Sequence, residues 1–168
     1  IPFMIIFIIG TVNAVNLTDG LDGLASGVTL IVSCFFVLFA VSISNSDVAI
    51  LAAATAGACL GFLGFNSYPA KVFMGDTGSM ALGGAVVAFA TLTNSSLLIV
   101  IVGFIYLAEA LSVMIQVTYF KLTNGKRIFK MAPLHHHFEQ CGWPETRVVF
   151  IFWIATVVLC WIGVLAVF

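Results

Sequence analysis

The sequence predicts an all-α fold, a polytopic bundle of transmembrane helices. Of its 168 residues, 62% are hydrophobic and only 8% are charged, and the mean hydropathy of +1.20 lies far above that of soluble globular domains. Apolar runs long enough to cross a hydrocarbon core recur along the chain, whereas the short alternating pattern of a transmembrane barrel is absent. Helices satisfy their own backbone hydrogen bonds in lipid. We therefore expect residues 1–168 to form one transmembrane helical domain.

The apolar runs predict about five spans, preceded by the end of a truncated one. We interpret the opening run, Ile1–Val12, as the tail of a helix that starts earlier, and the chain as part of a longer protein. The five spans that follow are separated by polar tips and loops: Val28–Ile43, Val48–Phe65, Met80–Thr93, Leu97–Phe120 and Val148–Phe168.

Alternation of these spans across the membrane places three loops on one side, Asn13–Gly27, Asn66–Ser79 and Lys121–Arg147. All six Lys and Arg residues of the chain fall in these three loops. The positive-inside rule makes that side cytoplasmic. Three Asp residues and every His lie there too, so we expect loops on the cytoplasmic face to form the functional site.

The first loop gathers amides and carboxylates: Asn13, Asn16, Asp19 and Asp22. Because Asp19 and Asp22 are three residues apart, their carboxylates approach one face of a helical turn. The glycines beside them weaken a helix, so we expect the helix to break near Thr18–Gly20, restart, and line a cavity. The alternative is a plain interfacial turn with Asp as a cap. The ligand pattern of an EF-hand is missing.

The second loop contains Gly75–Ser79 immediately before a helix of small residues. Glycines and a helix N-terminus favour an anion such as phosphate, although the spacing of a P-loop is absent. The alternative is that Asp76, Thr77 or Ser79 caps the helix. Mg²⁺ prefers one or two carboxylates plus phosphate and water. Asp76 facing the acids of the first loop would supply that environment.

The third loop carries three adjacent histidines, His135–His137. Zinc sites space their ligands more widely. Near Lys126, Arg127 and Lys130 the histidines suggest donors to phosphate or a general acid/base. For the basic residues, contact with anionic lipid headgroups is an equal alternative.

Glu109, Ser112 and Gln116 form a polar stripe on one helix face. Acids at membrane depth usually face the bundle interior or a cavity. Interhelical packing is the alternative for Glu109 and Ser112, while Gln116, nearest the cytoplasmic end, is the better candidate for a ligand contact. Phe73 suits core packing or stacking on a base.

Three stretches carry a family resemblance: NAVNLTDGLDGLA, FNSYPAKVFMGDTGSMALGG and RIFKMAPLHHHFEQCGWPE. They resemble the polyprenyl-phosphate N-acetylhexosamine-1-phosphate transferases, and the MAPLHHHFE segment resembles the phospho-N-acetylmuramoyl-pentapeptide transferase (translocase I) branch. The resemblance covers nearly the whole chain and corresponds to the C-terminal half of ten-helix members.

The resemblance implies a Mg²⁺-dependent enzyme of the bacterial cytoplasmic (inner) membrane. It implies transfer of phospho-N-acetylmuramoyl-pentapeptide from UDP to undecaprenyl phosphate, which gives lipid I and UMP in peptidoglycan synthesis. The implied partners are UDP-N-acetylmuramoyl-pentapeptide, undecaprenyl phosphate, the bilayer and a second copy of the chain in a homodimer; nucleic acid is not among them. Direct attack and an Asp-bound intermediate both fit these residues.

The resemblance also implies residue roles. Asp76 resembles the Mg²⁺ ligand and Asn16 a second one, while Asp19, Asp22, Asp76 and His135 resemble catalytic residues. The implied substrate-binding residues are Asn16, Gly20, Leu21, Asn66, Phe73, Gln116, Ala132, His136 and His137. Phe73 would then stack on uracil.

One element of the family pattern, an aspartate pair followed by a lysine, has no counterpart in the 168 residues. We therefore expect the chain alone to be inactive. One alternative is the sister transferase that uses UDP-N-acetylglucosamine, against which MAPLHHHFE argues. Another is an ion-coupled transporter built on Glu109 and broken helices. A transporter predicts inverted repeats with midplane breaks, whereas the polar groups here gather at one face.

Overall fold

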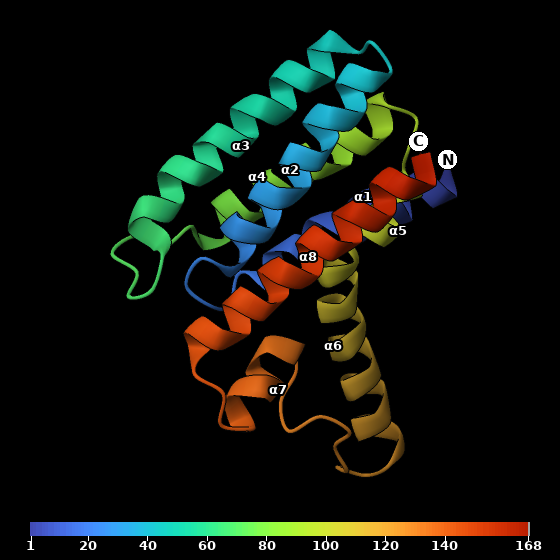
Figure 1. Cartoon of the computed structure of the whole chain (residues 1–168). Helices are drawn as coiled ribbons and strands as arrows, with labels where there is room; N and C mark the ends of the chain where they lie inside the picture. Colours follow the sequence, from blue (N-terminus) through green and yellow to red (C-terminus); the bar gives the residue numbers. More distant parts are fainter. Residues whose placement is uncertain (168) are drawn as a thin grey trace.

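The computed structural model describes residues 1–167, and within them it contains helices, turns and no strand (Figure 1). This confirms the predicted all-α fold. Phe168, the last residue of the predicted final span, lies outside the described part. The helices are α1 (Pro2–Thr18), α2 (Leu24–Ser42), α3 (Ser46–Asn66), α4 (Gly75–Leu92), α5 (Leu98–Val102), α6 (Phe104–Leu122), α7 (Leu134–Gln140) and α8 (Glu145–Val167).

Four helices, α2, α3, α6 and α8, are long and apolar enough to cross a membrane. The sequence predicted about five spans, and the difference lies in α4. This helix begins with the polar segment Gly75–Ser79, which the prediction assigned to a loop. Length and composition of the described residues therefore support a polytopic membrane bundle with four such helices.

The predicted span Leu97–Phe120 is two helices, α5 and α6, separated at Gly103. A Cβ at Gly103 would lie 2.9 Å from the Ile99 carbonyl oxygen and 3.2 Å from the Tyr106 ring. The absence of a side chain lets the chain turn there. In consequence α5 packs on α8, whereas α6 packs on α1 and projects away from the other helices (Figure 1).

The predicted break after the first helix is confirmed. Helix α1 ends at Thr18, whose hydroxyl donates to the Ala14 carbonyl at 2.8 Å. Helix α2 begins after Gly23, which has a φ of +78°, a conformation that favours glycine. Asn13 and Asn16 thus belong to α1, and the four residues Asp19–Asp22, called the acidic turn below, connect the two helices.

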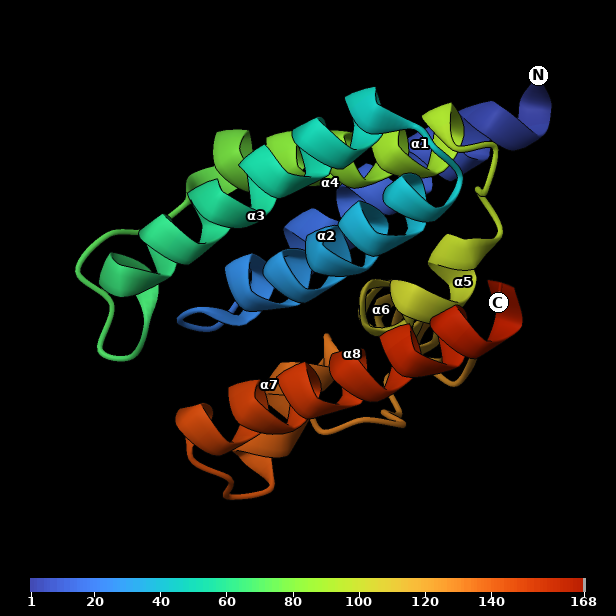
Figure 2. The same cartoon turned by 45° about the horizontal axis from the view of Figure 1, so that its top comes forward.

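Helix α2 lies at the centre of the bundle, between α3 and α4 on one side and α8 on the other (Figure 2). Two-thirds of its membrane-length window is buried (67%), against 28–33% for the three other candidate spans. Its Phe36 packs against Phe89 of α4, with ring centroids 5.7 Å apart. The central helix therefore holds the elements around it.

Three connections lie at the left and bottom of Figure 1: the acidic turn, the α3–α4 loop and the segment between α6 and α8. We call this the site end of the bundle. All Lys and Arg residues lie on these connections or in the helix turns beside them. The α2–α3 and α4–α5 connections lie at the opposite end (Figure 1).

Gly83 and Gly84 give a matched test of the α1–α4 packing. A Cβ at Gly83 would lie 2.7 Å from the Val12 Cα, whereas a Cβ at Gly84 meets nothing within 4 Å. We expect Gly83→Ala to lower the free energy of unfolding by about 1–3 kcal/mol because it overpacks two backbones. Gly84→Ala should leave it unchanged or raise it by up to about 1 kcal/mol. Thermal unfolding in detergent measures both; equal shifts would contradict the packing.

Candidate active site

Helices α1 and α4 bring Asn16 and Asp76 together at the site end. The Asn16 side-chain nitrogen donates to the Asp76 carboxylate at 3.1 Å and to the Ser79 hydroxyl at 2.9 Å. The Ser79 hydroxyl also contacts the carbonyls of Gly75 and Asp76, at 3.1 and 3.3 Å. Gly75 has a φ of +65° and starts α4. Ser79 is buried and Asp76 exposed, so the carboxylate faces outward from a fixed base.

The acidic turn places a second carboxyl near Asp76. Burial raises the pKa of Asp19 above its ordinary value of 3.8, and the negative charge of Asp76 raises it further. Among residues 1–167 neither carboxylate forms an ion pair with Lys or Arg. The pair is therefore electrostatically strained unless a cation or a proton joins it.

The donors around Asp76 fit Mg²⁺ by type, since two carboxylates and an amide are hard oxygen ligands. No group of three or more His, Cys, Asp or Glu close enough to hold a metal occurs in the part of the chain that the structure describes. Mg²⁺ does not need one, because it commonly binds one or two carboxylates and completes its shell with water and phosphate. Asn16 directs its nitrogen at Asp76, so its amide would have to turn over to share an ion with it.

Asp22 bonds two other segments. Its carboxylate accepts from the Ala70 backbone N–H at 2.8 Å, in the α3–α4 loop. Its own N–H donates to Glu145 of α8 at 2.7 Å. Asn66, 4% exposed, accepts from Gly23 N–H and Ser26 Oγ at 3.1 and 2.9 Å. Asp22 and Asn66 thus fix the loop that leads to Asp76.

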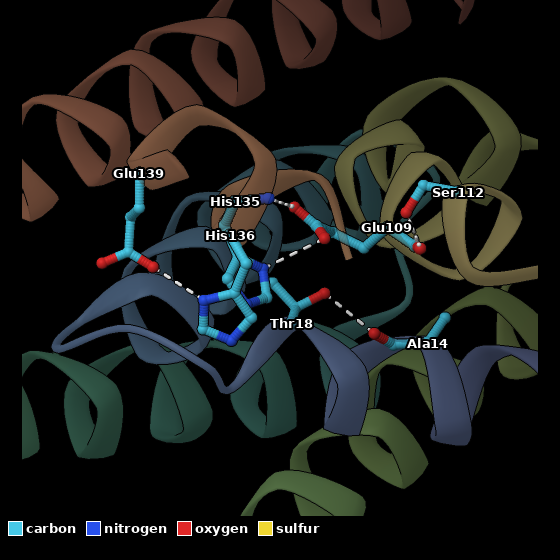
Figure 3. Close-up of polar contacts among 7 residues, drawn as sticks. All are labelled: Ala14, Thr18, Glu109, Ser112, His135, His136 and Glu139. Carbon is cyan, nitrogen blue, oxygen red and sulfur yellow. Dashed lines mark hydrogen bonds and ion pairs between the residues drawn. The ribbon is translucent and has the colours of Figure 1, made fainter. Parts of the chain in front are cut away.

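The histidines lie on α7, which packs between α6 and α8 (Figure 3). His135 is 1% exposed and Glu109 is 0% exposed. One Glu109 oxygen accepts from the His135 backbone N–H at 3.2 Å, and the other lies 3.0 Å from His135 Nδ1. His135 Nε2 is buried without a partner among the described residues. It lies against Gly20 of the acidic turn, where a Cβ would collide with it.

The next two histidines have different surroundings. His136 is partly exposed and pairs with Glu139 at 2.7 Å (Figure 3). Its ring lies 4.2 Å from that of His135, centroid to centroid. His137 accepts from the Lys130 backbone N–H through Nδ1 at 3.1 Å. His136 therefore presents a partly exposed imidazole next to the buried ring of His135, while His137 fixes the preceding loop.

Gln116 is engaged by the same loop. Its oxygen accepts from the N–H groups of Ile128 and Phe129, at 3.1 and 3.0 Å, and its nitrogen donates to the Phe129 carbonyl at 3.1 Å. Gln116 and Ala132 line a cavity of about 370 Å³ between α6 and this loop. The amide of Gln116 therefore serves the backbone of the loop, and the cavity opens beside it.

Two predicted substrate-binding residues differ sharply in exposure. Phe73 is 74% exposed on the α3–α4 loop, which leaves its ring free to stack and argues against core packing. Leu21 is 9% exposed and belongs to the hydrophobic core beneath the acidic turn. The structure thus brings Asn16, Asp19, Asp76 and Ser79 together, and separately His135, His136 and Gly20.

Three residues that the structure places at or beside the site were not predicted from the sequence: Glu109, Glu145 and Ser79. For Glu109 a signal existed, because it is the one acid inside an apolar span. The alternative that Ser79 caps α4 is wrong: Met74 is the N-cap residue, without a side-chain cap bond, and the Ser79 hydroxyl donates to the Gly75 carbonyl within the helix. Glu145 gives no local signal, since its contact is with Asp22, far away in the sequence.

Residues 1–95 match the model of glycosyl transferase family 4. The chain belongs to this family. It is 78% identical over 169 residues to the phospho-N-acetylmuramoyl-pentapeptide-transferase of Clostridioides difficile, covering 100% of the chain and 52% of the relative. It is 59% identical over 167 residues to the protein of the same name from Acetivibrio thermocellus, covering 99% and 50%. The resemblance found in the sequence is confirmed.

A further relative of that name, from Clostridium botulinum, is 56% identical over 166 residues, with 99% of the chain and 51% of the relative covered. The chain thus spans about half the length of the curated relatives it matches.

Replacing Asp19 tests the strain between the two carboxyls. A raised pKa means that ionised Asp19 destabilises the fold, so stability is present at low pH and is lost as pH rises through that pKa. We expect Asp19→Asn to raise the melting temperature by a few degrees at pH 7 in EDTA. The gain should vanish well below pH 3.8, where the carboxyl is protonated in both the folded and the unfolded state, and shrink when MgCl₂ is added. A variant that melts lower than the unmodified protein at pH 7 would contradict the strain.

Replacing Asp22 tests its hold on the α3–α4 loop. Asp22→Ala removes the acceptor of the Ala70 N–H, and we expect hydrogen exchange in residues 67–74 to accelerate about fivefold, the equivalent of about 1 kcal/mol. Asp22→Asn is the matched control, because its amide oxygen accepts the same bond. The two variants should differ; identical protection in both would show that the carboxylate does not order the loop.

Proposed function

We propose that the chain contributes the catalytic face of a phospho-N-acetylmuramoyl-pentapeptide transferase. In the proposed reaction, a phosphate oxygen of undecaprenyl phosphate bonds the sugar-bearing phosphorus of UDP-N-acetylmuramoyl-pentapeptide. The bridging P–O bond breaks, UMP leaves and lipid I forms. The observation that carries the proposal is the Asn16–Asp76–Ser79 cluster with Asp19 beside it, at the bundle end that holds every Lys and Arg.

The acids require a cation, and a diphosphate substrate would bring one. Bound Mg²⁺ would neutralise charge on the diphosphate and on departing UMP. Asp76, exposed and fixed by Asn16, is the residue we propose to hold it, with Asn16 as a second ligand after its amide turns. Asp19 would face the same charge from the acidic turn, and its proximity to Asp76 supports that role.

The reaction joins two anions, so positive charge must oppose their repulsion. Six cationic side chains lie at the site end, and none pairs with an acid within residues 1–167. They and His136 are available to phosphate oxygens. Lys126, Arg127 and Lys130 belong to the loop held by Gln116, beside α7. We assign phosphate contacts to this loop; contact with anionic lipid headgroups draws on the same chemistry.

The nucleotide would lie over the α3–α4 loop, where the exposed ring of Phe73 can stack on uracil. The isoprenoid acceptor accounts for a site at the end of an apolar bundle. We place this end on the cytoplasmic face of the bacterial cytoplasmic membrane, because all the cations lie there. A second copy of the chain is the further partner we propose.

The muramoyl-pentapeptide substrate is preferred over UDP-N-acetylglucosamine on two grounds. The MAPLHHHFE segment comprises all of α7 except its last residue, together with the three residues before it, and its His135 lies against the acidic turn. The relatives with 78% and 59% identity also carry the muramoyl name. The aspartate pair and lysine of the family pattern have no counterpart in the 168 residues, so we assign the activity to a full-length transferase carrying them, and none to these residues alone.

UMP release tests the proposal in a full-length transferase in which residues 1–168 form the half that the chain matches in its relatives. We expect Mg²⁺-dependent release with UDP-muramoyl-pentapeptide and undecaprenyl phosphate, and loss of release in EDTA. Asp76→Asn should lower kcat at least about 100-fold, the scale of removing one stabiliser of developing charge. Asp47→Asn, the same change on an exposed residue at the opposite end, should leave kcat unaltered. Release only with UDP-N-acetylglucosamine, or full activity of Asp76→Asn, would overturn the assignment.

A further inference from the structure

Glu109 forms a buried contact with His135 that the reaction as proposed does not use. It lies on α6, fully buried, and both of its oxygens are engaged by one residue of α7 (Figure 3). One accepts from the His135 backbone N–H at 3.2 Å; the other lies 3.0 Å from His135 Nδ1. A carboxylate at this depth is costly when unpaired. Packing alone would be served as well by an apolar side chain.

The contact decides which ring nitrogen of His135 carries the proton. A carboxylate only accepts hydrogen bonds, and in that pairing the Nδ1 that faces Glu109 carries the hydrogen. In the neutral ring Nε2 then carries the lone pair. The second nitrogen of a histidine is commonly set in this way by the partner of the first.

The orientation fixed by Glu109 directs Nε2 at Gly20, in the middle of the acidic turn. A Cβ on Gly20 would collide with Nε2 and lie 2.7 Å from Cε1. The φ of Gly20 is not positive, so the imidazole, and not the backbone conformation, excludes a side chain there. The ring therefore supports the turn from the inside, between Asp19 and Asp22.

We propose that Glu109 is a positioning residue for the transfer reaction: it holds His135 as the Nδ1–H tautomer, and the imidazole so held supports the acidic turn opposite Asp76. The inference rests on the proposed function. It separates the three histidines, because His135 positions the turn while His136 remains accessible to substrate. Glu109 itself touches no reacting atom.

Glu109→Gln is the informative variant because it keeps the shape of the side chain. The amide oxygen can still accept from His135 N–H, but the amide nitrogen must then face Nδ1, which has to give up its hydrogen. The tautomer reverses and Nε2–H points at Gly20. We expect kcat for UMP release to fall about 10- to 100-fold, as small displacements of catalytic groups do. KM for the UDP substrate and the melting temperature should stay close to their unmodified values.

Two readouts separate this role from general packing. The full-length transferase is labelled with ¹⁵N-histidine, and the NMR signal that disappears in His135→Gln is assigned to His135. In the unmodified enzyme this signal should show the hydrogen on Nδ1. In Glu109→Gln it should show the hydrogen on Nε2. Ser112→Ala is the control on the same helix face, since the Ser112 hydroxyl bonds only its own helix, at the Glu109 carbonyl. It should alter neither kcat nor the tautomer.

Gly20→Ala keeps the inference testable if Glu109→Gln fails to fold. It should displace the imidazole and lower kcat to a similar extent, and the double variant should be no slower than the worse single one. An unchanged kcat or an unchanged tautomer in Glu109→Gln would overturn the inference, as would additive losses in the double variant. UMP release by the unmodified enzyme tests the proposed function separately: if it is absent the function fails, whereas the tautomer is read without substrate.

Discussion

The amide of Asn66 is buried at the end of α3, and two of the three site segments depend on it. Its oxygen accepts from the start of α2, at Gly23 and Ser26, while its nitrogen donates to Val72 in the α3–α4 loop at 3.0 Å. Gln116 does the same for the third segment with three bonds to the loop before α7. A backbone that leaves its helix at a membrane surface has unpaired N–H and C=O groups. Buried amides, which both donate and accept, satisfy these groups.

The Lys, Arg and Asp side chains of the site differ from these amides, because they lack partners of opposite charge in the described part of the chain. The buried amides bond the loop backbones, whereas the side-chain charges are not neutralised: within residues 1–167 no Lys or Arg pairs with an Asp or Glu. The negative charges of Asp19 and Asp76 repel each other, and the Lys and Arg residues lie on other segments. Surface charges left apart contribute little to stability. They suit a site that receives a metal ion and a polyanionic substrate together, since each then meets opposite charge.

Particular residues show which features of the fold and the site the sequence could predict. The break at Thr18–Gly20 was predictable, because Asp-Gly pairs interrupt an apolar period at a known place. The break at Gly103 was not, because an isolated glycine in an apolar run is also tolerated within a helix. Motifs predicted the grouping of Asn16, Asp19 and Asp76. The hydrogen bonds of Asp22 with Ala70 and Glu145 depend on how α8 meets the α3–α4 loop, and such long-range contacts leave no local pattern.

The histidine run shows most directly why adjacency in sequence is a poor guide to role. Successive residues of a helix are turned by about 100° from one another, so three neighbouring imidazoles on α7 must face three environments. His135 is buried and contacts Glu109, and His136 is partly exposed and contacts Glu139. His137 accepts a hydrogen bond from the Lys130 backbone N–H. The buried carboxyl group of Glu109 on α6 gives the buried imidazole of His135 a hydrogen-bond partner. The same acid thereby links a helix that projects from the bundle to the turn that carries Asp19.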